Sequence, residues 1–241
     1  MVFKRQLQRM QLLLIIMSLA LSVGAQSPSG KYIVFLTSNP SGADLSKAAV
    51  DALQAAHQAN IDSLKQARRL LASGSLHGGG GIFVLAAATL DEAQTIINHD
   101  PTVAAGRFVA EVFPFSMTIG GICIPAEKYE MSEYQFIRYV PVPEALAGLS
   151  EKKIEKLSRR HSGYLKMNFY EHALIADADF GSGQGGILVA FNGDADKFDH
   201  FLQYDPFVKS GMYKPVSGIL WIAQGTFCER KPEQKTNGQH R

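Results

Sequence analysis

The 241-residue chain lacks an excess of charge of either sign. Its 24 lysine and arginine residues nearly balance 22 aspartate and glutamate residues, which gives a formal net charge of +2. Three of the positive charges and no negative charge lie in the first 25 residues, so the rest of the chain carries about −1. Proteins that bind nucleic acid use a basic surface to neutralise phosphates. The sequence therefore predicts no nucleic-acid partner.

The sequence also lacks the motifs that hold common cofactors. Gly181-x-Gly183-x-x-Gly186 matches a dinucleotide fingerprint, but it enters a predicted strand instead of leaving one and opening a helix. The glycines at 78–81 lack the Lys-Ser/Thr of a phosphate loop and are typical of a tight hairpin. Four histidines show no zinc-ligand spacing: His77, His99, His172 and His200. We expect neither a cofactor nor a metal, and no motif places a nucleophile.

A ten-residue, predominantly apolar run occurs at the N-terminus. It spans residues 12–21, follows Lys4, Arg5 and Arg9, and precedes the small residues at 23–25. This order predicts a secretory signal peptide over residues 1–25, removed after export. Ten residues are too few to span a bilayer comfortably, and the alternative is an uncleaved anchor. We therefore expect a secreted or periplasmic protein without membrane attachment after cleavage.

One stretch of sequence occurs twice, at residues 80–106 and 185–211, with a constant offset of 105 and no gap. Self-similarity at one fixed offset in two copies indicates a duplicated domain and not a solenoid. Nine positions are identical: Gly80/Gly185, Gly81/Gly186, Ile82/Ile187, Val84/Val189, Asp91/Asp196, Asp100/Asp205, Pro101/Pro206, Val103/Val208 and Gly106/Gly211.

Both copies predict the same succession of elements. A glycine pair opens a short apolar run, typical of a buried strand, and Thr89 or Asp194 then starts an amphipathic helix. In the first copy we predict strands at 31–36, 75–77, 82–88 and 107–117, with a long helix at 44–73 that ends at Gly74. In the second we predict strands at 134–140, 174–180, 187–191 and 212–223, with a long helix from Ser150 to about Tyr170. The order strand, helix, strand, strand, helix, strand is that of a ferredoxin-like unit.

The residues that recur around this repeat resemble a known family. With the histidine 43 or 44 residues before the aspartate, each copy resembles a YCII-related domain of the dimeric α/β-barrel superfamily. The residues concerned are His57, Gly74-x-Leu76 and Asp100-Pro101-x-Val103-Ala104-Ala105-Gly106 in the first copy, and His161 and Asp205-Pro206-Phe207-Val208-x-x-Gly211 in the second. The resemblance implies a His/Asp active site and a dimer, here an internal pseudo-dimer. It also implies a relation to dehydrochlorinase-type and muconolactone-isomerase-like enzymes.

The predicted fold is therefore α+β, with two ferredoxin-like (βαββαβ) repeats packed sheet to sheet as an intramolecular dimeric α/β barrel. Further association is left open. The expected organisation is a signal peptide at 1–25, a first domain at 26–124, a linker at 125–132, a second domain at 133–228 and a disordered polar tail at 229–241. The chain departs from the family where a basic residue usually follows the histidine by three positions, since Asn60 and Tyr164 stand there.

The residue types of the pair support catalysis independently. A histidine on an apolar helix face is commonly a hydrogen-bonded core residue, and an aspartate before proline is commonly a turn residue. Both recur at matching distances, however, and buried polar groups need partners. A carboxylate on one imidazole nitrogen fixes the tautomer and leaves the other nitrogen as a base. We predict His57, Asp100, His161 and Asp205 as catalytic residues.

Two classes of function follow. The first is a cofactor-independent isomerase or lyase that acts on a small cyclic or aromatic molecule inside the barrel. The second is a non-catalytic exported protein that binds a small molecule or has a structural role. The sequence selects neither substrate nor reaction.

The two cysteines, Cys123 and Cys228, are also 105 residues apart and follow the last strand of each copy. Equivalent residues of two copies can meet only near the pseudo-twofold axis, and an even cysteine count in an exported protein favours pairing. We expect a Cys123–Cys228 disulfide, and the alternative is two separate buried thiols.

Overall fold

The structure is a computed structural model that describes residues 30–42, 44–125, 128–181 and 183–228. The predicted signal peptide and the predicted disordered tail lie outside these ranges. The first half comprises β1 (Gly30–Ser38), α2 (Lys47–Gln66), β2 (Leu70–Leu76), β3 (Gly81–Ala87), α3 (Leu90–Asn98), α4 (Pro101–Ala104), β4 (Phe108–Pro114), β5 (Ser116–Ile119) and β6 (Gly121–Ile122). The second comprises β7 (Met131–Pro141), α5 (Pro143–Ala147), α6 (Glu151–Met167), β8 (Leu174–Asp179), β9 (Gly186–Phe191), α7 (Ala195–Tyr204), α8 (Pro206–Lys209), β10 (Tyr213–Ala223) and β11 (Phe227–Cys228).

Nine strands form one antiparallel sheet in the order β4-β1-β3-β2-β10-β7-β9-β8-β5. Its two ends, β4 and β5, are consecutive in the chain and separated only by Phe115. The sheet therefore curls until its ends meet at one residue. The expected α+β class is confirmed.

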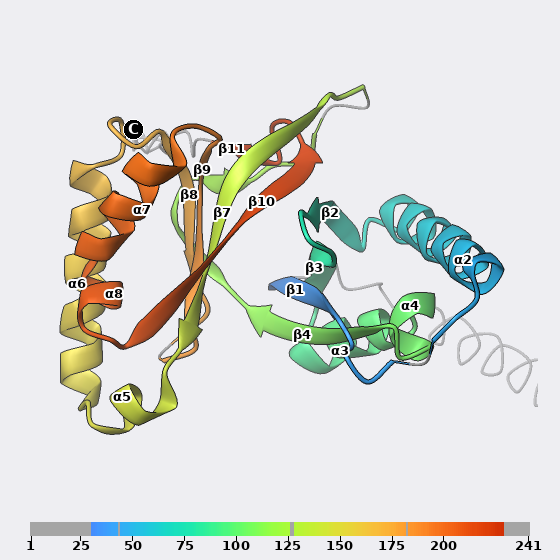
Figure 1. Cartoon of the computed structure of the whole chain (residues 1–241), viewed down its shortest axis with the longest axis horizontal. Coiled ribbons are helices and arrows are strands. Elements are labelled where there is room, and N and C mark those ends of the chain that lie inside the picture. Colours follow the sequence, from blue (N-terminus) through green and yellow to red (C-terminus); the bar gives the residue numbers. More distant parts are fainter. Residues whose placement is uncertain (1–29, 43, 126–127, 182, 229–241) are drawn as a thin grey trace, which may run out of the picture.

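The helices lie outside the curled sheet. α6 and α7 flank the strands of the second half, and α2 and α4 flank those of the first half on the other side of the molecule (Figure 1). Because side chains alternate along a strand, each strand supplies one set of residues to the inside of the sheet and one to its helices. Separate apolar clusters accordingly lie beneath the helices of each half and inside the curled sheet.

The inside of the sheet is filled, which corrects the expectation of a substrate inside the barrel. Buried residues of both halves share this cluster, among them Ile33 and Val84 from the first half and Ile187 and Leu220 from the second. Aromatic rings pack there too, with centroids 6.0 Å apart for Phe35–Phe180. Apolar side chains on both faces of the buried strands fill the space on each side, so the interior of the sheet is hydrophobic core.

The long helix of the first half ends earlier than predicted. Ser46 caps α2 by accepting a hydrogen bond from the Ala49 amide, but the helix stops at Gln66 and Arg68 takes a positive φ of 55°. The segment at 70–76 is a strand that pairs with both β3 and β10, so the predicted C-cap Gly74 lies within a strand. The residues of this segment favour a helix, but pairing with the neighbouring strands decides their conformation, because helix propensity is a weak preference.

The repeated glycine pair is explained by close backbone contact. Gly80 and Gly185 have φ of 76° and 88°, and a Cβ at either would lie 2.0 Å from the carbonyl oxygen of Leu36 or Tyr139. Only glycine accepts both the positive φ and the absence of space. The duplicated motif thus marks the entry of the central strand in both halves.

Cys123 and Cys228 form a disulfide with an S–S distance of 1.98 Å and a Cα–Cα distance of 5.9 Å. It lies beside the two-stranded sheet made by β6 and β11, so it ties the end of the first half to the end of the second. Among the helices in the described ranges, none is long and apolar enough to cross a membrane.

Candidate active site

In the first half, His57 of α2 meets Asp100 at the start of α4. The His57 Nδ1 atom lies 2.9 and 2.8 Å from the two Asp100 carboxylate oxygens. Asp100 is the N-cap of α4 and accepts a hydrogen bond from the Thr102 amide at 2.9 Å. Pro101 at the first position favours this helix start. The cap therefore fixes the carboxylate beneath the long helix.

The remaining partners of Asp100 keep it ionised. Asn60 donates to Asp100 at 2.9 Å, and the Thr102 hydroxyl donates as well. Burial alone would raise the pKa of the carboxyl group, but the hydrogen bonds and the neighbouring His57 outweigh burial and lower the pKa to about 2. Asn60 thus acts as a neutral donor to the carboxylate.

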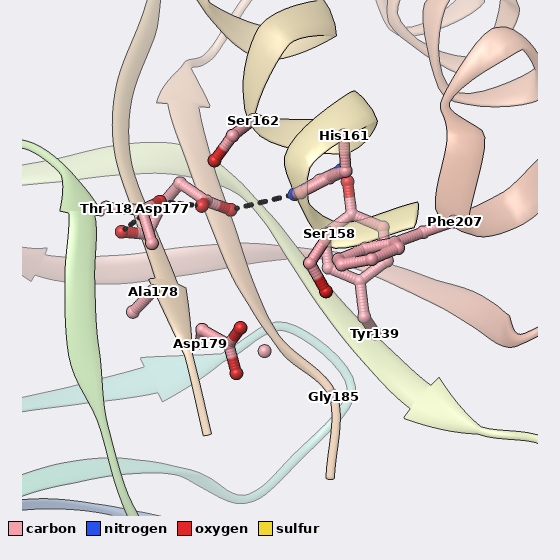
Figure 2. A pocket seen from close by; sticks show the side chains of 11 residues that line it. Thr118, Tyr139, Ser158, His161, Ser162, Asp177, Ala178, Asp179, Gly185 and Phe207 are labelled. Atoms are coloured by element: carbon pink, nitrogen blue, oxygen red, sulfur yellow. Dashed lines mark hydrogen bonds and ion pairs between the residues drawn. The ribbon is translucent and has the colours of Figure 1, made fainter. Parts of the chain in front are cut away.

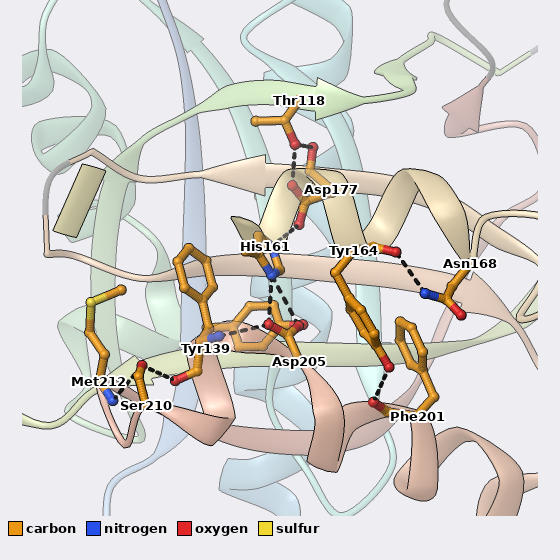
Figure 3. Close-up of polar contacts among 11 residues, drawn as sticks. Thr118, Tyr139, His161, Tyr164, Asn168, Asp177, Phe201, Asp205, Ser210 and Met212 are labelled. Atoms are coloured by element: carbon orange, nitrogen blue, oxygen red, sulfur yellow. Dashed lines mark hydrogen bonds and ion pairs between the residues drawn. The ribbon is translucent and has the colours of Figure 1, made fainter. Parts of the chain in front are cut away.

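The second half repeats this arrangement with His161 of α6 and Asp205 at the start of α8. The His161 Nδ1 atom lies 2.8 and 3.0 Å from the Asp205 oxygens (Figure 3). The Phe207 amide donates to Asp205 at 2.9 Å. Here Tyr139 of β7 supplies a donor, its hydroxyl lying 2.7 Å from Asp205. Burial, with the nearby carboxylates, holds the pKa of Tyr139 well above its usual range, so it remains a donor.

The two halves differ at the other imidazole nitrogen. His161 Nε2 lies 3.4 Å from Asp177 of β8, whose other oxygen accepts from the Thr118 hydroxyl (Figures 2 and 3). His161 is therefore held between two carboxylates. The expected free nitrogen is absent at His161. At His57, Nε2 has no hydrogen-bond partner within the described parts of the chain and is not fully enclosed.

His161 is a cation at neutral pH. Burial lowers its pKa, but the hydrogen bonds and charges of Asp177 and Asp205 outweigh burial and raise the pKa from 6.5 to about 9. Its ring also stacks on Phe207 with centroids 3.9 Å apart. The buried triad Asp205–His161–Asp177 thus comprises two carboxylates and one imidazolium.

Asp177 and Thr118 were missed from the sequence because neither recurs in the repeat. A signal was present, since aspartate within an otherwise apolar strand is unusual unless it is paired. Asp177 is 3% exposed, so its burial requires the contacts that His161 and Thr118 provide.

A small pocket of about 40 Å³ lies beside His161. Ser158, Ser162 and Asp179 contribute polar atoms to it, and His161 and Asp177 form part of its wall (Figure 2). The pocket has room for a few water molecules or a group of a few heavy atoms, whereas benzene occupies cavities of about 150 Å³. It therefore fits a small polar group better than an aromatic ring.

Both His/Asp pairs lie beneath the helices and not in a shared hollow. Phe83, which stacks on His57, belongs to the cluster under the first-half helices, and Phe207 to the cluster under the second-half helices. The two pairs therefore form separate sites, each between the outer face of the curled sheet and the helices of its own half. Within the described ranges, no group of three or more His, Cys, Asp or Glu side chains is arranged to hold a metal ion.

Comparison with known proteins finds one family match, in the first half of the chain. Residues 31–116 match the model of the YCII-related domain. No curated protein matches the chain. Among solved structures, an arginine-to-glutamate variant of chlorite dismutase from Candidatus Nitrospira defluvii is 12% identical, covers 82% of this chain and 92% of its own, and has a TM-score of 0.50. A tryptophan-to-phenylalanine variant in complex with cyanide is 14% identical, covers 81% and 92%, and has a TM-score of 0.49. At 12% identity, the match with a TM-score of 0.50 shows a shared fold and no more.

Proposed function

We propose that this chain, whose residues 31–116 form a YCII-related domain, is a cofactor-independent acid–base enzyme of the isomerase or lyase kind. Its working site is the pocket beside His161 in the second half. The observation that carries the proposal is the buried triad, in which Asp205 holds His161 and His161 holds Asp177 at the pocket wall.

Each member of the triad has a separate role. Asp177 accepts a proton from a carbon next to a carbonyl group: the C–H bond breaks, an O–H bond forms, and the electron pair stays on the substrate as an enolate. The His161 imidazolium offsets the second buried carboxylate and stabilises the negative charge that develops nearby. The enolate then takes the proton back at another atom, which is isomerisation, or expels a leaving group, which is elimination. Neither outcome needs an oxidant or a cofactor.

The pocket favours a small substrate that is not anionic. Asp177, Asp179 and Asp205 outnumber the one cation, His161, so the local charge is negative. A volume of about 40 Å³ admits a reacting group of a few heavy atoms. Neutral and cationic carbon acids such as acetone, hydroxyacetone and aminoacetone fit both conditions.

Deuterium exchange in D2O tests the proposal without knowledge of the product. Proton abstraction from carbon exchanges hydrogen for deuterium, which NMR of the three compounds detects. We expect exchange of at least one compound by the wild type, and loss of it in Asp177→Asn and His161→Gln. Asp179→Asn is the matched control, because Asp179 lines the pocket and hydrogen-bonds Gly181 instead of the histidine. Undiminished exchange in Asp177→Asn would refute the assignment.

A second candidate is a purely structural role for the pairs. Asp100 and Asp205 are helix N-caps, and each joins its cap to the long helix through a histidine. Under this alternative His57→Ala and His161→Ala unfold the protein, whereas the catalytic proposal predicts a folded and inactive His161→Ala. Binding of a compound without deuterium exchange would favour a binding protein.

The finer architecture and the location belong to the same proposal. We propose that both halves are ferredoxin-like repeats, because β4-β1-β3-β2 and β10-β7-β9-β8 repeat one strand order with the same helix connections. Together they would form within one chain a barrel that related proteins form by dimerisation. We also propose that the protein is secreted or periplasmic, since disulfides persist in oxidising compartments.

A further inference from the structure

A larger pocket, of about 190 Å³, lies elsewhere on the second half. It is bounded by the first turn of α7 and by the neighbouring strands β7 and β10. Phe198, Ile137 and Ile219 contribute apolar surface, and Gln135, Ser217 and Asp199 contribute polar groups. It shares no lining residue with the pocket beside His161.

The same place in the first half is filled by a tyrosine. Tyr32 pairs with Leu85 and Pro114. Gln135 pairs with Ala190 and Ile219, which lie 105 residues after Leu85 and Pro114 and are their equivalents in the second half. Gln135 therefore occupies the position of Tyr32, which is 8% exposed and packs in the cluster beneath the first-half helices. An amide in place of a phenol ring leaves space in the second half that the first half does not have.

A second wall position shows a matching change. Val34 pairs with Val112, and Ile137 pairs with Ser217, so Ser217 stands where the first half has Val112. Two positions that carry apolar side-chain bulk in one half thus carry hydrogen-bonding groups in the other. Both polar replacements line the pocket, where Gln135 is buried and Ser217 is exposed.

Gln135 is the buried polar group of this pocket. Its side chain is almost enclosed, at 7% exposure of the residue, yet its amide has no hydrogen-bond partner among the residues that the structure describes. Its polar atoms are not fully enclosed, so a ligand in the pocket can supply the partner. The amide can both donate to and accept from a ligand hydroxyl.

We infer that this pocket binds a small, uncharged, ring-shaped molecule that carries a hydroxyl group. A cavity of about 150 Å³ admits benzene, so 190 Å³ accommodates one substituted ring. Phe198 and Ile137 contact the ring, Gln135 and Ser217 bond the hydroxyl, and the Asp199 carboxylate disfavours anions. The inference is independent of the chemistry proposed at His161.

Phenol is the probe, with benzoate as an anion of similar size. Titration of isotope-labelled full-length protein by NMR should give saturable shifts at the residues that line this pocket, and benzoate should bind at least tenfold more weakly. Gln135→Tyr restores the first-half residue and should weaken phenol binding at least tenfold without loss of the fold. Ser217→Val, the other first-half residue, serves if Gln135→Tyr does not fold. His161→Gln should leave phenol binding unchanged.

Two results would overturn the inference. One is the absence of phenol-induced shifts at this pocket in the wild-type protein, and the other is undiminished binding in both filling variants. Either result leaves the deuterium-exchange test at the His161 site unaffected, because that test uses a different pocket and different variants.

Discussion

Asp177 and Ser73 occupy the same place in the two halves, since Asp177 pairs with Leu188 and Ser73 pairs with the equivalent Phe83. A carboxylate therefore faces the histidine of the second half, whereas a hydroxyl group stands at that position in the first. The charges around the shared His/Asp pair therefore differ between the halves. Among the residues that the structure describes, a triad with an imidazolium between two carboxylates occurs in the second half alone.

The first prediction concerns the pKa of His161. Replacing Asp177 by serine, as in the first half, removes one of the two carboxylates that raise this pKa to about 9 against the effect of burial. An adjacent opposite charge shifts a pKa by roughly 1 to 3. We expect Asp177→Ser to lower the pKa of His161 by at least about 1, as measured from the pH dependence of the imidazole NMR signals.

Asp179→Asn provides the control for this titration. Asp179 lines the pocket but accepts its hydrogen bond from the Gly181 amide, at 2.6 Å. The pKa of His161 should change little in that variant. An equal fall in both variants would mean that general pocket charge, and not the Asp177 contact, sets the pKa.

The second prediction is a loss of stability in mild alkali. The folded state raises the pKa of His161 from 6.5 to about 9, so the folded protein binds this proton more tightly than the unfolded chain. The resulting stabilisation, about 3 kcal/mol, is complete below pH 6.5 and is lost as the pH rises through about 9. Urea unfolding of the oxidised protein between pH 6 and about 10 measures it.

His161→Gln should remove most of this pH dependence. The glutamine variant keeps a donor at the site but cannot titrate, so its free energy of unfolding should change little across the same interval. If the wild type and the variant lost stability in parallel, other groups would account for the alkaline loss. His57→Gln tests whether the effect belongs to the second half alone.

The third prediction concerns the disulfide between Cys123 and Cys228. The two cysteines are 105 residues apart, so the bond constrains a long loop in the unfolded chain. Such a cross-link stabilises a protein by about 2–5 kcal/mol. We expect reduction to lower the thermal midpoint, and the double variant Cys123→Ser/Cys228→Ser to show that lower midpoint with or without reductant. A wild-type midpoint that does not respond to full reduction would contradict the prediction.

Much of this architecture could be predicted because the same sequence pattern occurs twice in the chain. The glycine-opened strands, the helix starts at Thr89 and Asp194, and the recurring His/Asp spacing are visible as one pattern at two places. Features outside the repeat were not predictable in this way. The counterpart of Asp177 in the first half is Ser73, so a comparison of the two copies does not reveal Asp177 as a site residue.

Two other errors have physical causes. Residues 70–73 (Leu-Leu-Ala-Ser) favour a helix locally, but pairing with β3 draws them into a strand, and such long-range pairing cannot be seen in local preference. The alternation along the strands shows two buried faces but not the size of the side chains that meet between the halves. Rings such as Phe35 and Phe180 fill that space and exclude a ligand.

The last prediction distinguishes two kinds of glycine in the repeat. Gly185 and Gly211 both have positive φ, at 88° and 71°. A Cβ at Gly185 would lie 2.0 Å from the Tyr139 carbonyl oxygen, whereas one at Gly211 would meet nothing within 4 Å. Gly211→Ala should therefore cost only the left-handed backbone penalty, about 1–2 kcal/mol. Gly185→Ala must in addition separate β9 from β7 and should cost clearly more, or prevent folding. Urea unfolding of both variants, with Gly80→Ala and Gly106→Ala as the matching pair in the first half, measures the difference. Equal losses at Gly185 and Gly211 would show that backbone conformation alone, and not contact with the neighbouring strand, requires the glycine.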